Sequence, residues 1–308
     1  MRHPAWTIAL CLAAAASACA AVPKRPPITA LSHIALYAAH PARSEHFYVH
    51  DLGGVRGTDP EQASGVRYYF APTQFVEVLP LPRGWTSSSR LDHVAFVTTD
   101  AAGLRRYLIY KRIRPVSAVH RGSDGSLWFD VRDPEGNDIQ FVQPPAHPPR
   151  IPVNPLSRHI IHVGFIIHDR ALEDRFYRAV LGFRPYWYGG MTDTRTQWVS
   201  QQVPDGTDWL EYMLVDPPHG RGIPPDMKKS DVGVLDHFSL GVRNAEAAYT
   251  LLWNGDRLEA QDNLPKIGRD AKWQINLYDP DGTRAELMEL HAIGKPCCSP
   301  FTASDPDY

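Results

Sequence analysis

The stretch HIALYAAHPARSEHFYVHDLGG, from His33 to Gly54, decides the fold because it occurs a second time in the chain. The stretch HVGFIIHDRALEDRFYRAVLGF, from His162 to Phe183, aligns with it without a gap. A second match joins LDHVAFVTTDAAGLRRYL, from Leu91, to LDHFSLGVRNAEAAYTLL, from Leu235. Matches in the same order and at similar spacings indicate that the two halves are homologous, and that aligned residues occupy equivalent positions in space.

Each half divides again into two modules, so the chain holds four. His33, His93, His162 and His237 each open a short apolar run, which is typical of a strand. Helix-like stretches follow, such as 42–49 and 172–180. Further strands are expected at 66–71, 75–79, 127–131, 138–142, 197–203, 209–215, 272–278 and 284–290. The pattern of one strand, one helix and then more strands predicts an α+β fold.

The turns Asp133-Pro-Glu-Gly and Asp279-Pro-Asp-Gly stand before the last strand of each half. Proline presets φ, and glycine accepts the left-handed position that a tight turn requires. These turns therefore predict that the last strand runs antiparallel to the strand before it.

The length of 308 residues suits about two domains, each with a core of its own. We expect domains at 30–145 and 158–292, a proline-rich linker at 146–157 and a tail at 293–308. The net charge of −2 gives no electrostatic reason to expect nucleic acid as a partner. The aromatic residues are not interleaved with Arg and Lys as a base-stacking surface would be.

Residues 1–20 have the form of a secretory signal peptide: Arg2, an apolar run from Thr7 to Ala16, and small residues up to Ala20. The apolar run is too short to span a bilayer. The chain is therefore expected to be exported, to the periplasm or the outside of the cell. The run from Ala16 to Cys19 resembles the lipobox of bacterial lipoproteins, so a lipid anchor at Cys19 stays open.

The cysteines give no disulfide framework. Removal of the leader would discard Cys11, and also Cys19 if cleavage follows it, and would leave the adjacent pair Cys297 and Cys298 near the C-terminus. We expect two thiols in a mobile tail, with a vicinal disulfide or a soft-metal site as alternatives.

The final strand of every module contains one acid or amide among apolar residues, and the first strand of every module begins with a histidine. The acids and the amide are Glu77, Gln140, Glu211 and Glu286. Gln140 and Glu286 each lie seven residues after the aspartate of their Asp-Pro turn, so they are equivalent. A carboxylate on a half-buried strand is unfavourable unless it is paired, protonated or bound to a cation. A role as metal ligand satisfies that requirement.

With these residues the chain resembles the vicinal oxygen chelate superfamily, which includes glyoxalase I, extradiol dioxygenases, an epimerase and the bleomycin resistance proteins. The resemblance implies tandem βαβββ modules, paired into open cup-shaped mixed β-sheets in two domains. Carried onto this sequence, it implies a metal set of His162, Glu211, His237 and Glu286 in the C-terminal half. Two imidazoles and two carboxylates suit divalent Fe, Mn, Ni, Co or Zn.

The equivalent N-terminal set is His33, Glu77, His93 and Gln140. An amide replaces one carboxylate there, so this second site is expected to bind metal more weakly, or to be structural only.

The resemblance leaves several reactions open, because one scaffold hosts lyases, isomerases, dioxygenases and binding proteins. Glutamate on the last strand of both C-terminal modules resembles the glyoxalase I and epimerase pattern, in which Glu211 or Glu286 acts as general base. We expect a metal-dependent lyase or isomerase that acts on a small substrate with vicinal oxygens. The strand before the final turn has no histidine, unlike the extradiol dioxygenases, which remain an alternative. The other alternative is a non-catalytic protein whose cup is lined by Trp187, Tyr188, Trp198 and Trp209.

Overall fold

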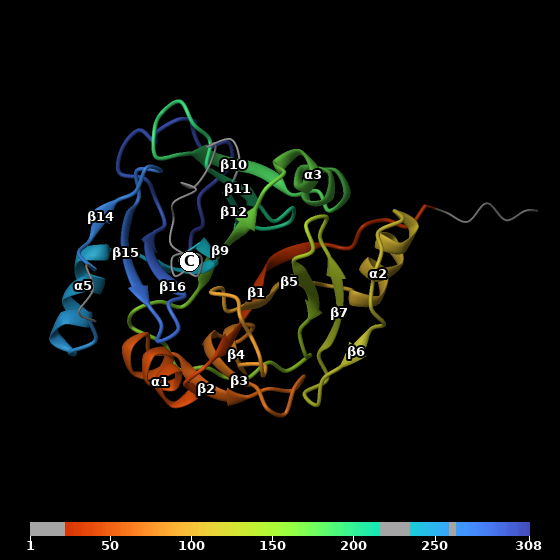
Figure 1. Ribbon diagram of the computed structural model, residues 1–308, viewed down its shortest axis with the longest axis horizontal. Coiled ribbons are helices and arrows are strands. Elements are labelled where there is room, and N and C mark those ends of the chain that lie inside the picture. The colour runs from red at the N-terminus through yellow and green to blue at the C-terminus, as the bar shows by residue number, and fades with distance from the viewer. Residues whose placement is uncertain (1–21, 216–234, 259–262) are drawn as a thin grey trace, which may run out of the picture.

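The computed structural model describes residues 22–215, 235–258 and 263–308, and it consists of two eight-stranded mixed sheets. The strand order is β2-β3-β4-β1-β5-β8-β7-β6 in one sheet and β10-β11-β12-β9-β13-β16-β15-β14 in the other. The two orders are the same, because each strand of the first sheet corresponds to the strand numbered eight higher in the second, such as β1 to β9. Figure 1 shows the two sheets curving side by side, with the few helices at their margins.

The N-terminal sheet contains two modules. The first consists of β1 (Ile28–Ala38), α1 (Pro41–Glu45) continuing as the π-helical η1 (His46–Asp51), β2 (Val55–Thr58), β3 (Val66–Ala71) and β4 (Gln74–Pro80). The second consists of β5 (Leu91–Thr98), α2 (Ala101–Tyr110), β6 (His120–Arg121), β7 (Leu127–Arg132) and β8 (Asp138–Gln143).

The C-terminal sheet repeats this plan. Its first module consists of β9 (Ile160–Ile167), α3 (Arg170–Asp174), η2 (Arg175–Val180), β10 (Arg184–Gly189), β11 (Trp198–Gln202) and β12 (Trp209–Leu214). Its second consists of β13 (His237–Val242), α5 (Ala245–Asn254), β14 (Lys266–Ile267), β15 (Trp273–Tyr278) and β16 (Arg284–Glu289).

The centre of each sheet brings the first and last strands of its modules together. In the C-terminal sheet, β9 and β13 are antiparallel neighbours, and each pairs in parallel with the last strand of its own module, β12 or β16. The N-terminal sheet pairs β1, β5, β4 and β8 in the same way. Gly136 and Gly282 have φ of 93° and 90°, as the Asp-Pro turns require. The expected tandem fold of cup-shaped mixed sheets is confirmed.

The two halves share one core rather than the two that the chain length suggested. Buried apolar side chains form a continuous cluster from Ile28 to Leu287, to which both sheets contribute. The helical segments pack across the halves: the Tyr48 hydroxyl donates to Asp279 at 2.9 Å, and the Tyr177 hydroxyl donates to Asp133 at 3.2 Å. Each tyrosine thus binds the Asp-Pro turn of the opposite half, and the contact occurs twice because the chain is a repeat.

The C-terminal tail is packed, contrary to the expectation of a mobile segment with two thiols. Cys297 and Cys298 form a vicinal disulfide. Asp305 binds the buried ammonium group of Lys272 at 2.9 Å and also accepts from Tyr186. Because Lys272 is buried, its ammonium group needs a charged partner, and the tail supplies one.

No helix in the described residues is long and apolar enough to cross a membrane. The expected signal peptide, including Cys11 and Cys19, lies outside these residues.

Candidate metal centre

The strand register of the C-terminal sheet brings the four expected ligands together. Ser239 pairs with both His162 and Glu286, and Gly164 pairs with both Glu211 and His237. The four expected ligands are therefore adjacent across the centre of the sheet. His162 Nε2 lies 3.1 Å from His237 Nε2 and 3.3 Å from the Glu286 carboxylate. Ligand atoms of these three residues all lie within 4.8 Å of one another. Glu211 stands beside them, with its carboxylate 3.5 Å from His237 Nε2.

The two imidazoles have the protonation state that a metal ligand needs. Burial lowers the pKa of both His162 and His237 well below the ordinary value, so both rings are neutral. His237 Nδ1 lies 2.8 Å from the carbonyl oxygen of Leu235. Because a carbonyl only accepts, Nδ1 carries the proton, which leaves a lone pair on Nε2 facing His162 and Glu211. Stacking on Trp209 fixes the ring of His162.

The two carboxylates differ in their surroundings. Glu286 is buried, and burial raises its pKa to about 7. The side chain of Glu211 is 14% exposed, and the Ser200 hydroxyl donates to it at 3.3 Å. No Lys or Arg of the described ranges forms an ion pair with either one. Two neutral imidazoles and two carboxylates that form no ion pair with Lys or Arg fit a divalent cation.

A cavity of about 520 Å³ opens onto this set. Glu211 and Glu286 form part of its wall, and His162 and His237 are buried behind them. Seven large apolar side chains line it: Trp187, Met191, Trp198, Met213, Leu235, Ile267 and Met288. The charged residues Lys266, Arg269, Asp270 and Arg284 line it as well. Of the four aromatic residues expected in the cup, Trp187 and Trp198 line the cavity, Trp209 packs beneath His162, and Tyr188 lies outside it.

Three of the four N-terminal candidates also converge. His33 Nε2 lies 2.9 Å from His93 Nε2, and the Glu77 carboxylate lies 4.0 Å from His33 and 3.8 Å from His93. Gln140 lines the same pocket as Glu77 and His93, and its amide nitrogen donates to Glu61 at 2.9 Å. Its Oε1 atom is buried without a hydrogen-bond partner among the described residues, so it stays available as a fourth ligand.

The two sites differ in the residue beside their first glutamate, which is a buried arginine in the N-terminal half. Arg67 lies 3.5 Å from Glu77, 2.6 Å from Glu61 and 3.3 Å from Asp59. Arg67 pairs with Glu77 across β3 and β4, and Ser200 pairs with Glu211 at the equivalent place across β11 and β12. The N-terminal glutamate is thus neutralised by a guanidinium, whereas the C-terminal glutamate meets only a hydroxyl.

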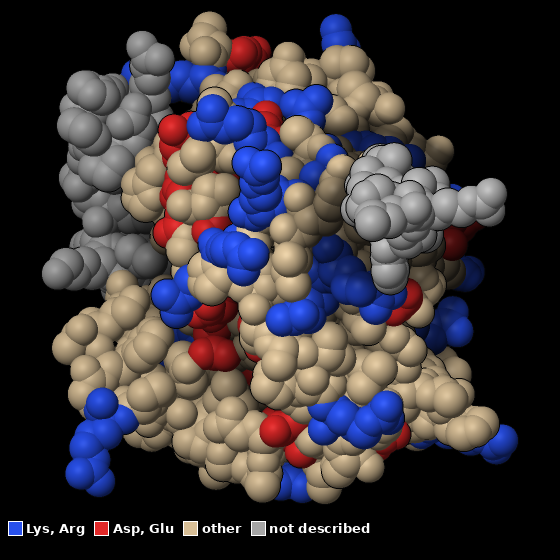
Figure 2. All heavy atoms as spheres, turned by 90° about the vertical axis from the view of Figure 1, so that its right-hand side faces the viewer, with Lys and Arg blue, Asp and Glu red and all other residues tan. Residues whose placement is uncertain are grey.

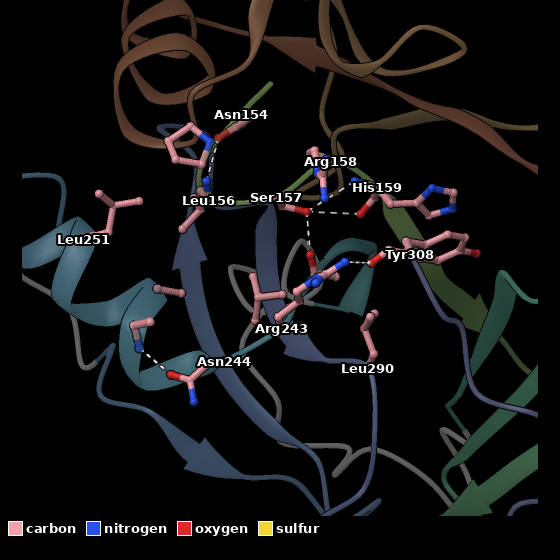
Figure 3. Close-up of a pocket in the computed structure, with 15 residues that line it drawn as sticks. Asn154, Leu156, Ser157, Arg158, His159, Arg243, Asn244, Leu251, Leu290 and Tyr308 are labelled. Atoms are coloured by element: carbon pink, nitrogen blue, oxygen red, sulfur yellow. Dashed lines mark hydrogen bonds between the residues drawn. The ribbon is translucent and has the colours of Figure 1, made fainter. Parts of the chain in front are cut away.

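A second cavity, of about 230 Å³, lies apart from both sets (Figure 3). Asn154 to His159 form one side and the start of α5 forms another, while the chain end at Tyr308 lies against His159, away from α5. Arg243 donates to the backbone oxygen of Tyr308 at 3.0 Å, so this end of the chain is fixed in place. None of the residues expected to bind metal lines this cavity.

Sequence reasoning did not identify Ser200, Arg67 or the Leu235 carbonyl. A charged residue inside the apolar strand 66–71 was a signal that could have pointed to Arg67. Ser200 and the carbonyl carry no such signal, because their roles follow from strand register.

Comparisons with known proteins agree with this geometry. The family model of the Glyoxalase/Bleomycin resistance protein/Dioxygenase superfamily matches residues 159–287. No curated protein matches the chain in sequence.

Among solved structures, the chain is similar to the 2,3-dioxygenase LapB from Pseudomonas sp. KL28, with 15% identity and a TM-score of 0.59 over 86% of this chain and 93% of that one. It is also similar to homoprotocatechuate 2,3-dioxygenase from Brevibacterium fuscum in complex with 3,4-dihydroxyphenylacetate. That similarity has 17% identity and a TM-score of 0.62 over 91% of this chain and 86% of that one. At these identities the likeness shows the fold. The family match thus covers the C-terminal half, residues 159–287, and the structural likeness shows the same fold, that of the vicinal oxygen chelate proteins, in two tandem domains.

Proposed function

We propose that the protein is a metal-dependent enzyme of the lyase or isomerase type, which acts on a small substrate through two vicinal oxygens in the C-terminal cup. The observation that carries this proposal is the convergence of His162, His237 and Glu286 within 4.8 Å, beside a cavity. These residues would hold the ion, with Glu211 as the fourth member. A bound divalent cation would hold the substrate oxygens and stabilise the negative charge that develops on them.

Glu211 is our choice for the general base. Its carboxylate lies outside the compact group of three, lines the cavity and is the more exposed of the two glutamates. It can therefore reach a carbon-bound proton next to a chelated carbonyl, while Glu286 stays buried among the histidines. The Ser200 hydroxyl, 3.3 Å away, orients the carboxylate.

Arg284 narrows the substrate class. Its side chain lines the same cavity, and its Nε atom is buried without a hydrogen-bond partner in the part of the chain described. A cation beside an apolar cavity favours a substrate with an apolar body and an acidic group. The equivalent residue on β8 is Asp138, so the preference belongs to the C-terminal cup alone.

Hydrogen exchange tests the proposed reaction. Metal-loaded protein is incubated in D₂O with a panel of small 2-hydroxy and 2-oxo carbonyl acids, and loss of the carbon-bound proton is followed by NMR. Glu211→Gln is expected to slow exchange by about 10² to 10⁴-fold while the metal stays bound. Glu246→Gln, an exposed change on α5, serves as control. Equal exchange in Glu211→Gln and wild type would contradict the assignment of the base.

Extradiol ring cleavage is the second candidate. Two histidines and one carboxylate with open positions are typical of non-haem Fe(II) oxygenases, and the compact group here has that composition. The structures similar to this chain include enzymes named as 2,3-dioxygenases. Oxygen uptake by the Fe(II)-loaded protein with catechols, without proton exchange in the acid panel, would favour this reaction over the first.

Export of the protein remains a proposal that rests on residues 1–20. Intact-mass measurement on protein recovered from the cell envelope tests it. A mass that lacks the leader supports export, an added lipid mass identifies the anchor at Cys19, and an uncleaved cytoplasmic chain contradicts both.

A further inference from the structure

Two exposed histidines and a carboxylate come together on η1, the π-helical segment of the N-terminal half. His50 Nδ1 lies 2.7 Å from a carboxylate oxygen of Asp51, and His46 Nε2 lies 3.7 Å from the same oxygen. The two imidazole rings stack, with their centroids 4.5 Å apart and their planes 15° apart. One ligand atom from each of the three residues lies within 4.8 Å of the other two. This cluster shares no residue with the two sets at the centres of the sheets.

The π-helical geometry of η1 produces this arrangement. In a π-helix the backbone hydrogen bond joins residues five apart, so the turn is wider than in an α-helix. The Leu52 amide accordingly donates to the Phe47 carbonyl oxygen at 3.0 Å. Both the fourth and the fifth residue after His46 therefore lie beside it, and these are His50 and Asp51. The histidines stay exposed, whereas the Asp51 side chain is only 10% exposed and is held at the edge of the core.

The internal repeat shows that the fold does not require these three residues. The second π-helical segment, η2, has Arg175, Ala179 and Val180 at the equivalent positions. None of these side chains has a lone pair that binds a metal ion. The Phe-Tyr pair that follows His46 or Arg175 is buried in both halves, so packing explains the residues that the two copies share. Packing does not explain the two histidines, which occur in one copy only.

The surroundings of the cluster suit a cation. Lys and Arg side chains gather on the face that carries α2 (Figure 2), where they would repel a metal ion. The helix α1, which continues into η1, lies on the opposite side of the molecule from α2 (Figure 1). No Lys or Arg in the described part of the chain forms an ion pair with Asp51. The negative charge of Asp51 is therefore shared with the two imidazoles alone.

We propose that His46, His50 and Asp51 form a surface site for a transition-metal ion such as Zn²⁺, Cu²⁺ or Ni²⁺. Imidazoles suit these ions, whereas Mg²⁺ and Ca²⁺ take oxygen ligands. With metal–ligand bonds of about 2.0 to 2.2 Å, neighbouring ligand atoms on a tetrahedral ion lie about 3.3 Å apart. The distances of 2.7 and 3.7 Å in the cluster lie on either side of that value, and rotation of the exposed rings supplies the adjustment.

A bound ion would also fix η1, which carries Tyr48 and so takes part in the contact between the halves. Because only the folded chain holds the three ligands together, binding stabilises the fold. Zn²⁺ at about five times its dissociation constant is expected to raise the midpoint of thermal unfolding of wild type by about 2 to 4 °C. His46→Gln/His50→Gln should show no such rise.

Titration with Zn²⁺, followed by calorimetry, tests the site directly. Untagged protein is first loaded with Zn²⁺ and dialysed, so that any tightly held ion is already in place. Wild type is then expected to take up one equivalent more than His46→Gln/His50→Gln. His50→Gln alone should weaken this equivalent by about 100-fold or more, because loss of a ligand costs at least as much as loss of an outer-shell partner. An excess of Mg²⁺ should not displace it.

The matched control is His40→Gln/His147→Gln, which removes two exposed histidines elsewhere and should keep the additional equivalent. The proposal is overturned if wild type takes up no additional equivalent, or if His46→Gln/His50→Gln keeps it. An equivalent lost equally in the control, or lost only in His33→Ala/His93→Ala, would also overturn it. Circular dichroism verifies folding, and the single variant His46→Gln replaces the double variant if that one unfolds.

Discussion

The residue opposite the ligand glutamate differs between the two histidine clusters of this protein. Arg67 and Ser200 occupy equivalent places opposite the glutamate of their sites, 3.5 Å from Glu77 and 3.3 Å from Glu211. A guanidinium next to a ligand carboxylate competes with a metal ion for the same negative charge. The repeat therefore contains its own comparison between a glutamate that a cation already pairs and one that is free to bind.

Placing serine at position 67 and arginine at position 200 should reverse the difference in metal affinity between the two sites. Arg67→Ser is expected to strengthen metal binding in the N-terminal half by about tenfold or more, and Ser200→Arg to weaken binding in the C-terminal half similarly. Titration with Mn²⁺ or Zn²⁺, followed by calorimetry, measures both. Unchanged affinity in both variants would show that the guanidinium has no part in the difference.

Gly164 on β9 makes room for a ligand on the neighbouring strand. It pairs with His237, and a Cβ at this position would overlap the imidazole ring. In the other half the equivalent pair is Ala35 and His93, and the His93 side chain is 12% exposed where His237 is fully buried. The small residue thus allows His237 to fold inward beneath the cavity.

We expect Gly164→Ala to displace His237 and lower metal affinity by about 10 to 100-fold, with the fold retained. Ala35→Gly is the matched control, since it enlarges the same space in the other half and should leave the C-terminal affinity unchanged. If Gly164→Ala binds metal as wild type does, then the position of His237 does not depend on this contact.

Most of the elements could be predicted from the sequence, because the period of two and the Asp-Pro turns are local signals. The expected strand at 66–71 is β3, and those at 209–215 and 284–290 match β12 and β16 to within one residue at each end. The short β2 and β10 were not predicted individually, since neither has a clear apolar alternation. The repeat also predicted which histidines and glutamates converge at the centre of each sheet. It did not predict that Gln140 would donate to Glu61, which depends on a loop contact.

A buried acid, Glu173, lies where the helical segment of one half packs on the Asp-Pro turn of the other half. Glu173 on α3 accepts from the Glu135 backbone at 3.1 Å, beside Asp133 in the Asp-Pro turn of the other half. Burial, followed by the charges of Asp133 and Glu135, raises the pKa of Glu173 from 4.5 to about 9. The equivalent residue in the second joint is Ser44, which is also buried and carries no charge.

This acid should make stability depend on pH. A raised pKa means that folding favours the protonated form, so the stability that Glu173 contributes is present below pH 4.5 and is lost as the pH rises towards about 9. Glu173→Gln is expected to be more stable than wild type at about pH 8.5 and close to it at about pH 4.5. Urea unfolding at both values measures this, with Ser44→Ala as a control. A Gln variant less stable at the higher pH would contradict the raised pKa.

The central claim is that the C-terminal cup holds the metal ion, and metal content per chain tests it most directly. Wild type, His162→Ala/His237→Ala and the matched variant His33→Ala/His93→Ala are loaded, dialysed and measured by mass spectrometry. We predict about one tightly held equivalent in wild type, lost in the first variant and kept in the second. Metal that persists in His162→Ala/His237→Ala, or that disappears only with His33 and His93, would contradict the account.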